Sequence, residues 1–116
     1  MTNIERHGVT KRWSEIVVHN SVAYWVEVAD DPSQDVRGQI AQILQQIDAT
    51  LVRIGGDRSR LLMIQIYLAD LADAPALNEL WDAWTFAGHA PVRACVQAGL
   101  SAGYRVEMVI TAATGD

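Results

Sequence analysis

The alternation of apolar and polar residues predicts seven elements in the order ββαβαββ. Segments 14–20 and 22–28 are enriched in the β-branched and aromatic residues that are typical of strands. Asn20 and Ser21 separate these two segments and favour a tight turn. We therefore expect the chain to open with a β-hairpin.

Two later segments show the apolar spacing of an amphipathic helix. Apolar residues recur every three or four positions over residues 36–54 and again over residues 75–87. Asp31 and Asp73 precede these segments, each shortly before a proline, and are the expected N-caps. Both helices have one apolar face, which must be buried against another element.

The remaining strands complete a two-layer α+β sandwich. Residues 60–69 are apolar almost throughout, as in a central strand that is covered on both faces. Segments 92–100 and 104–113 are joined by only three residues, 101–103, so we expect them to pair as an antiparallel hairpin. The two helices would then cover one face of the sheet, and residues 1–116 would form a single domain.

Composition narrows the class of protein. The formal net charge is −5, and the basic residues are scattered along the chain rather than clustered, which disfavours nucleic-acid binding. Cys95 is the only cysteine, so neither an intrachain disulfide nor a multi-cysteine zinc site is expected. The sequence shows no secretion signal and no apolar run long enough to cross a membrane, so we expect a cytoplasmic protein. We also expect the ordered structure to begin after about the tenth residue.

The predicted last hairpin carries the most informative side chains. Successive residues of a strand point to opposite faces, so the apolar sets are expected to face the helices: Val92, Ala94, Val96 and Ala98, then Val106, Met108, Ile110 and Ala112. Arg93, Cys95 and Glu107 would then converge on the opposite face. That face is either a solvated surface with an Arg93–Glu107 ion pair or, because it is less polar than most exposed faces, an interface with another subunit.

Other candidate groups have simpler interpretations. The three histidines are far apart in sequence and lack the spacing of metal ligands: His7, His19 and His89. Trp81 and Trp84 lie on the apolar face of the second helix and are expected in the core. Cys95 is either a small buried thiol or a thiol whose pKa is lowered by the neighbouring arginine.

The segment HAPVRACVQAGLSAGYRVEM, residues 89–108, resembles the C-terminal motif of the Rid family of reactive intermediate deaminases, also called YjgF-like proteins. The matching features are Pro91, Arg93, Val96 and the Arg105–Glu107 triplet. Residues 66–84 are similar to the strand–loop–helix segment of the family. The resemblance covers roughly residues 14–113.

This resemblance implies a homotrimer with active sites in clefts between subunits. Arg93 would bind the substrate carboxylate, and Glu107 would hold or activate a water molecule. Asn78 and Cys95 match positions in the family pocket. The implied reaction is hydrolysis of 2-enamine or 2-imine acids to 2-keto acids and ammonia, with no metal or cofactor. A cleft that binds small carboxylates such as 2-keto acids without turnover is the alternative, and ribonuclease activity is disfavoured by the charge.

The chain also departs from the family pattern. The N-terminal segment that lines the family pocket is replaced here by TKRWSE, residues 10–15, and the second strand reads YWVEV. Trp13, Ser14 and Trp25 are therefore candidates to line the pocket, while Val109 stands where a second glutamate is frequent.

Overall fold

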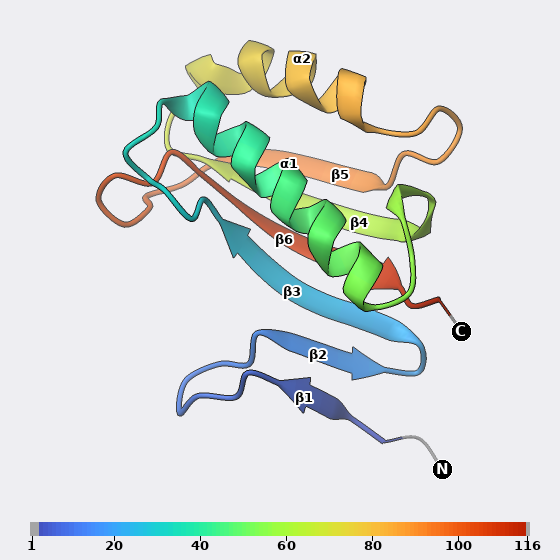
Figure 1. Ribbon diagram of the computed structural model, residues 1–116. Coiled ribbons are helices and arrows are strands. Elements are labelled where there is room, and N and C mark those ends of the chain that lie inside the picture. The colour runs from blue at the N-terminus through green and yellow to red at the C-terminus, as the bar shows by residue number, and fades with distance from the viewer. Residues whose placement is uncertain (1–2, 116) are drawn as a thin grey trace.

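The protein is a two-layer α+β sandwich, as the sequence predicts, with one six-stranded sheet and two helices on one of its faces (Figure 1). A computed structural model describes residues 3–115. The strands are β1 (Glu5–His7), β2 (Ile16–His19), β3 (Val22–Val28), β4 (Leu61–Leu68), β5 (Val92–Gln97) and β6 (Val106–Ala113). The helices are α1 (Val36–Arg53) and α2 (Ala74–Trp84), and short 3₁₀ turns cover Arg58–Arg60 and Leu71–Asp73. No helix in this range is both long and apolar enough to cross a bilayer.

The first hairpin forms where the sequence predicts it. Asn20 and Ser21 connect β2 to β3 and have φ angles of 53° and 61°. Two consecutive left-handed residues are the requirement of the tight turn whose twist matches that of paired strands. The strand β1 was not expected, because order was expected to begin after the tenth residue. It pairs with the outer edge of β2, and its polar residues give no strand signal in the sequence.

The expected hairpin between the last two strands is wrong. The sheet order is β1-β2-β3-β6-β4-β5, so β4 lies between β5 and β6, and β5 runs parallel to β4 (Figure 1). Residues 98–105 cross the end of β4, where Ala98 N donates to Leu68 O and Ala69 N donates to Arg105 O, both at 3.0 Å. Strands lie only about 4.8 Å apart, so a loop of this length readily skips one strand.

The parallel pairing reverses the expected faces of β5. Arg93 and Cys95 are the register partners of Ile64 and Ile66, which are buried beneath the helices. Val92, Ala94 and Val96 therefore point away from the helices, contrary to expectation. For β6 the prediction is confirmed, because Val106, Met108, Ile110 and Ala112 are fully buried on the helix side.

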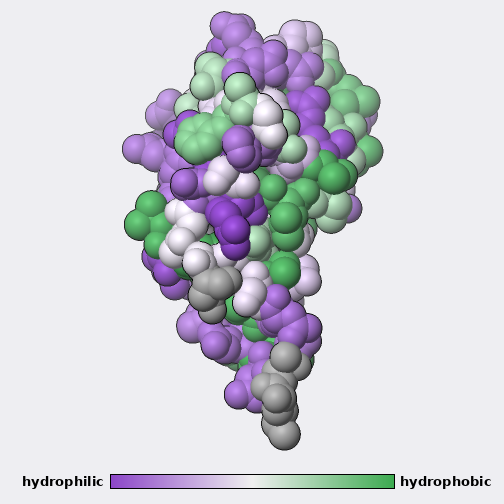
Figure 2. All heavy atoms as spheres, turned by 90° about the vertical axis from the view of Figure 1, so that its right-hand side faces the viewer, coloured by the Kyte–Doolittle hydropathy of each residue, from purple (hydrophilic) through white to green (hydrophobic). Residues whose placement is uncertain are grey.

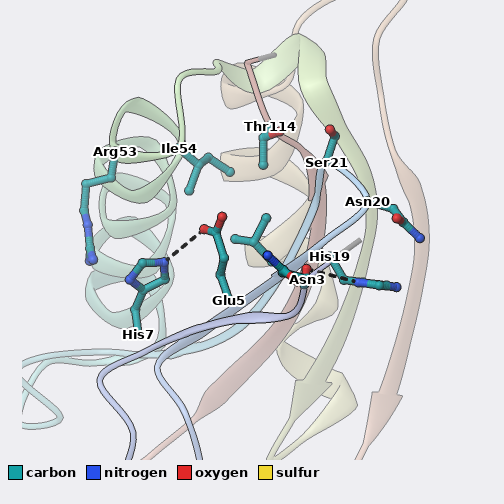
Figure 3. A pocket seen from close by; sticks show the side chains of 10 residues that line it. Asn3, Glu5, His7, His19, Asn20, Ser21, Arg53, Ile54 and Thr114 are labelled. Atoms are coloured by element: carbon teal, nitrogen blue, oxygen red, sulfur yellow. Dashed lines mark hydrogen bonds and ion pairs between the residues drawn. The ribbon is translucent and has the colours of Figure 1, made fainter. Parts of the chain in front are cut away.

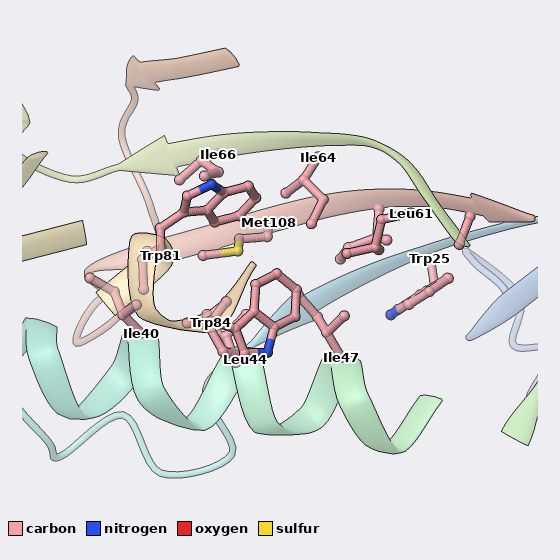
Figure 4. Packing of buried hydrophobic residues seen from close by; sticks show 14 of the residues in the cluster. Trp25, Ile40, Leu44, Ile47, Leu61, Ile64, Ile66, Trp81, Trp84 and Met108 are labelled. Atoms are coloured by element: carbon pink, nitrogen blue, oxygen red, sulfur yellow. The ribbon is translucent and has the colours of Figure 1, made fainter. Parts of the chain in front are cut away.

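The core fills the space between the helices and the sheet. Figure 4 shows α1 and the two tryptophans of α2 packed over the central strands. Trp81 and Trp84 are buried, as predicted, and their ring centroids lie 5.5 Å apart. Trp81 and Trp84 therefore anchor α2 to this core, on the side of the sheet where β5 lies (Figure 1).

The helix caps differ from those expected. Asp35, rather than Asp31, caps α1, and its Oδ1 accepts a hydrogen bond from Gly38 N at 2.9 Å. Asp31 instead closes the preceding turn by accepting from the backbone and hydroxyl of Ser33. Asp73 precedes α2 without a capping hydrogen bond, because its carboxylate is paired with Arg105 at 3.1 Å.

The sheet face opposite the helices is apolar over much of its area. Valine and tyrosine side chains of two strands are exposed there: Tyr24, Val26, Val92 and Val96. Val92 is 68% exposed and Val96 is 47% exposed. In the end-on view of Figure 2, apolar side chains gather along the right-hand side of the molecule. An uncovered apolar surface of this kind is typical of a protein interface.

Candidate functional site

Arg93 lies on the helix side of the edge strand β5, beneath α2. Its guanidinium carbon stands 5.2 Å from the centroid of the Trp81 ring, in cation–π geometry. Over residues 3–115 the structure gives Arg93 this ring contact and neither an ion pair nor a hydrogen bond. The side chain is exposed, so the tryptophan holds the guanidinium in place while leaving its N–H donors available to a ligand.

Cys95 is two residues further along the same face of β5. Its side chain is half-buried and packs against the hydrophobic core. Burial raises the pKa of the thiol, and the nearby charge of Arg93 only partly opposes that effect. Arg93 does lower the pKa of this cysteine, but burial has the larger effect and the net shift is upward, so the interpretation of Cys95 as a small, partly buried thiol is favoured.

Asn78 reaches the same region from α2. It is exposed and lies one helical turn before Trp81, and residues three apart on a helix are neighbours on its surface. Arg93 is in direct contact with the indole of Trp81, while Cys95 lies two residues along β5 and Asn78 three residues back along α2. The role of this tryptophan as a platform for Arg93 was missed, because its spacing was fully explained by burial.

Glu107 lies on the other face of the sheet, so the expected convergence with Arg93 within one chain is wrong. On β6 it stands opposite Tyr67 and Val28 in register, both on the face turned away from the helices. Among the described residues, no arginine, lysine or histidine forms an ion pair with Glu107. The alternative of an Arg93–Glu107 surface ion pair is also excluded, because a strand separates them and they face opposite ways.

A hollow of about 520 Å³ opens beside the end of β3 that carries Val28. It is lined by residues of the loop before β2 and of β3: Trp13, Ser14, Glu15, Val26, Glu27 and Val28. Trp13 and Ser14, both named as candidates from the sequence, therefore line a hollow that also includes Val28, the register partner of Glu107. Trp25, the third candidate, is buried in the core and donates its indole N–H to Glu27 at 3.0 Å.

The carboxylate of Glu27 ties β3 to α1. It accepts hydrogen bonds from Trp25 Nε1 at 3.0 Å, Gln46 Nε2 at 2.9 Å and Thr50 Oγ1 at 3.4 Å. Burial raises the pKa of Glu27 above its ordinary value, although these hydrogen bonds act in the opposite direction. All of these contacts are structural, and none leaves Glu27 available to a ligand.

The raised pKa of Glu27 predicts a pH-dependent stability. The folded state disfavours the charged carboxylate, so its contribution is most favourable below the unfolded pKa and is lost as pH rises through the folded value. We expect the free energy of unfolding of the wild type to fall relative to that of Glu27→Gln between pH 4 and 7. Urea unfolding of both proteins across this range measures the difference. A constant difference, or one of opposite sign, would contradict the assignment.

A second, polar hollow of about 450 Å³ lies between the first two strands and the C-terminal end of α1 (Figure 3). His7 and His19, distant in sequence, both line it. His7 Nε2 lies 3.7 Å from Glu5 Oε2, and His19 Nδ1 lies 3.4 Å from the backbone oxygen of Asn3. Between residues 3 and 115, no three histidine, cysteine, aspartate or glutamate side chains are grouped to hold a metal ion. None of the four expected site residues lines this hollow.

Comparison with known proteins places this geometry in a family. Residues 4–114 match the model of the Endoribonuclease L-PSP family. The chain belongs to this family, known also as the YjgF-like or Rid family, as the C-terminal motif predicted. The RutC family protein YoaB of Escherichia coli is 46% identical over 111 residues, which cover 95% of this chain and 97% of YoaB.

Two solved structures share the whole fold. A protein from Pseudomonas aeruginosa superposes with a TM-score of 0.91 at 44% identity, covering 97% of this chain and 99% of that one. A member of the YjgF protein family from Neisseria meningitidis gives a TM-score of 0.90 at 39% identity, covering 98% and 97% of the two chains. These likenesses extend over β5 and β6, which carry Arg93 and Glu107.

Proposed function

We propose that this Rid-family protein hydrolyses 2-imine and 2-enamine acids to 2-keto acids and ammonia, in clefts between the subunits of a homotrimer. Arg93 of one subunit and Glu107 of its neighbour would face each other across each cleft. The observation that carries the proposal is the free guanidinium of Arg93, fixed on Trp81 beside Cys95 and Asn78.

The need for a second subunit follows from the faces of the sheet. Arg93 and Glu107 lie on opposite faces of one chain, so a single site that uses both must draw them from two chains. The exposed valines on the Glu107 face supply an apolar surface that a neighbouring subunit would cover. A closed cyclic trimer would repeat the same contact three times and bury all three faces.

Arg93 would anchor the substrate. A guanidinium binds a carboxylate through two parallel N–H···O bonds, which fix the position and also the orientation of the substrate. The indole of Trp81 limits the movement of the guanidinium and so reduces the entropy lost on binding. Asn78 and the Cys95 thiol would border the bound carboxylate.

Glu107 would act on the water. An enamine first takes a proton at its β-carbon to become the imine. The water oxygen then bonds to C2 of the imine while Glu107 accepts a proton from the water. That proton is passed to the nitrogen, which gives a C2 hydroxyl and an amine. The hydroxyl proton then moves to the same nitrogen, the C2–N bond breaks, and ammonia leaves as the C2 carbonyl forms. No electron is exchanged with an oxidant or reductant, and holding the two reactants in place is the main requirement.

The proposal is tested by producing 2-aminoacrylate with a serine dehydratase and following the appearance of pyruvate with and without this protein. A faster appearance supports the deaminase. Calorimetry with 2-oxobutyrate separates the alternative, because binding of the keto acid without any acceleration of hydrolysis would indicate a cleft that only binds carboxylates.

Ribonuclease activity, which the family description names, finds no support in this chain. The net charge of −5 and the absence of a basic cluster in the sequence give no surface for a phosphate backbone. We expect no RNA binding at physiological salt. Binding of a single-stranded RNA that weakens steeply as salt is raised would contradict this expectation.

A further inference from the structure

The hollow beside Glu107 has mainly apolar walls. Trp13, which is 63% exposed, lines it together with Val26 and Val28. The pairing of β2 with β3 ends at Ile16 and Trp25. The last residues of β3 therefore extend past the beginning of β2, and the loop that carries Trp13 is not paired with them. The hollow is this gap between loop and strand.

The two carboxylates at its border are directed elsewhere. Glu27 is held by the three donors from β3 and α1 described above. The side chain of Glu15 folds closely over Gly8, so that a side chain at position 8 would collide with the Glu15 carboxyl group. The hollow therefore presents mainly an aromatic ring and valines, with Glu27 engaged by its three donors and the side chain of Glu15 lying against Gly8.

The hollow is tied to the reaction centre through one pair of residues. Val28 lies directly opposite Glu107 in the β3–β6 ladder, and directly opposed residues have Cβ atoms about 5 Å apart. A substrate whose C2 is near the Glu107 carboxylate would thus have the hollow within reach of its side chain. A methyl or methylene group would leave the indole and the valines uncovered.

We propose that the side chain of the substrate occupies this hollow, and that the preferred substrates are imines of bulky apolar amino acids such as leucine and phenylalanine. Trp13 is the specificity-determining residue. This inference rests on the proposed deaminase function and extends it to the side-chain class. Imines of small, acidic or basic amino acids are poorer substrates, because they leave the apolar walls uncovered or bring a charge against them.

The test compares imines that an L-amino acid oxidase makes from leucine, phenylalanine, alanine and arginine, with semicarbazide to trap whatever imine escapes hydrolysis. The leucine and phenylalanine imines should be hydrolysed with a kcat/KM about 10- to 100-fold above that of the alanine imine. Trp13→Ala should remove most of this preference, and Trp13→Phe should keep it. Val52→Ala, at an exposed position of α1, is the control that should change nothing.

A preference for the alanine or arginine imine, or a leucine preference that survives Trp13→Ala, would overturn the inference while leaving the deaminase intact. If the protein accelerates the hydrolysis of none of these imines, the proposed function fails. Calorimetry then tests separately whether the hollow binds an apolar side chain. Tighter binding of 4-methyl-2-oxopentanoate than of pyruvate, lost in Trp13→Ala, would support the hollow as the side-chain site. Equal binding of the two keto acids would overturn it.

Discussion

Replacing Arg93 with alanine should lower kcat/KM for imine hydrolysis by roughly 100- to 1,000-fold. The variant loses both charge-assisted hydrogen bonds to the substrate carboxylate, each a contribution of about 1.5–3 kcal/mol. Steady-state rates on a series of substrate concentrations measure the change. The fold should be unaffected, because Arg93 is exposed and contacts its own chain chiefly through the Trp81 ring.

Two further variants separate charge from geometry. Arg93→Lys keeps the positive charge but not the planar fork, so its activity should fall between those of wild type and Arg93→Ala. Arg37→Ala removes an exposed arginine that pairs with Glu79 on the surface of the helix layer, and its activity should match wild type. Activity of Arg93→Ala equal to that of Arg37→Ala would show that Arg93 does not bind the substrate.

Replacing Gln39 with alanine should destabilise the protein by about 3 kcal/mol, because a fully buried side chain is removed and the backbone groups that it bonds lose their partner. The Gln39 side chain is fully buried in the first turn of α1. Its Nε2 lies within hydrogen-bond distance of the carbonyls of Pro32, Gln34 and Gly103, and its Oε1 accepts from Arg105 N at 2.8 Å. This amide therefore ties the loop that leads from β5 into β6 to the start of α1.

Urea unfolding measures this effect, with Gln45→Ala as the matched control. Gln45 is a glutamine of the same helix, but it is exposed, and its removal should change the free energy of unfolding by less than about 0.5 kcal/mol. Gln39→Leu keeps much of the volume and should destabilise nearly as much as Gln39→Ala. A Gln39→Leu protein as stable as wild type would show that packing, and not hydrogen bonding, is what Gln39 contributes.

The sequence predicts the elements of this fold better than their pairing. The spacing of apolar residues marks both helices, and the Asn20–Ser21 turn identifies the first hairpin. The order of β4, β5 and β6 was missed because β5 has small apolar residues on one face and Arg93 with Cys95 on the other. Alternation alone cannot show which of these faces meets the helices. The deciding factor is the parallel pairing with β4, a contact between segments about thirty residues apart.

The same limit applies to the candidate site. The C-terminal motif identifies Arg93 and Glu107 through resemblance, and the structure places the Arg93 guanidinium on the Trp81 ring. The placement of Arg93 and Glu107 on opposite faces depends on the sheet order and could not be read from spacing. Trp13 could be named as a candidate, but its hollow depends on where β2 stops pairing with β3.

The most direct test of the two-subunit site is complementation between two inactive variants. Arg93→Ala and Glu107→Gln proteins should each be trimeric and nearly inactive on 2-aminoacrylate. Trimers formed by co-expressing both in equal amounts contain clefts with Arg93 from one variant and Glu107 from the other. Random assembly in a cyclic trimer makes roughly a quarter of the clefts wild type, so about a quarter of wild-type activity should return. Mixed trimers no more active than either variant alone would contradict a site shared between subunits.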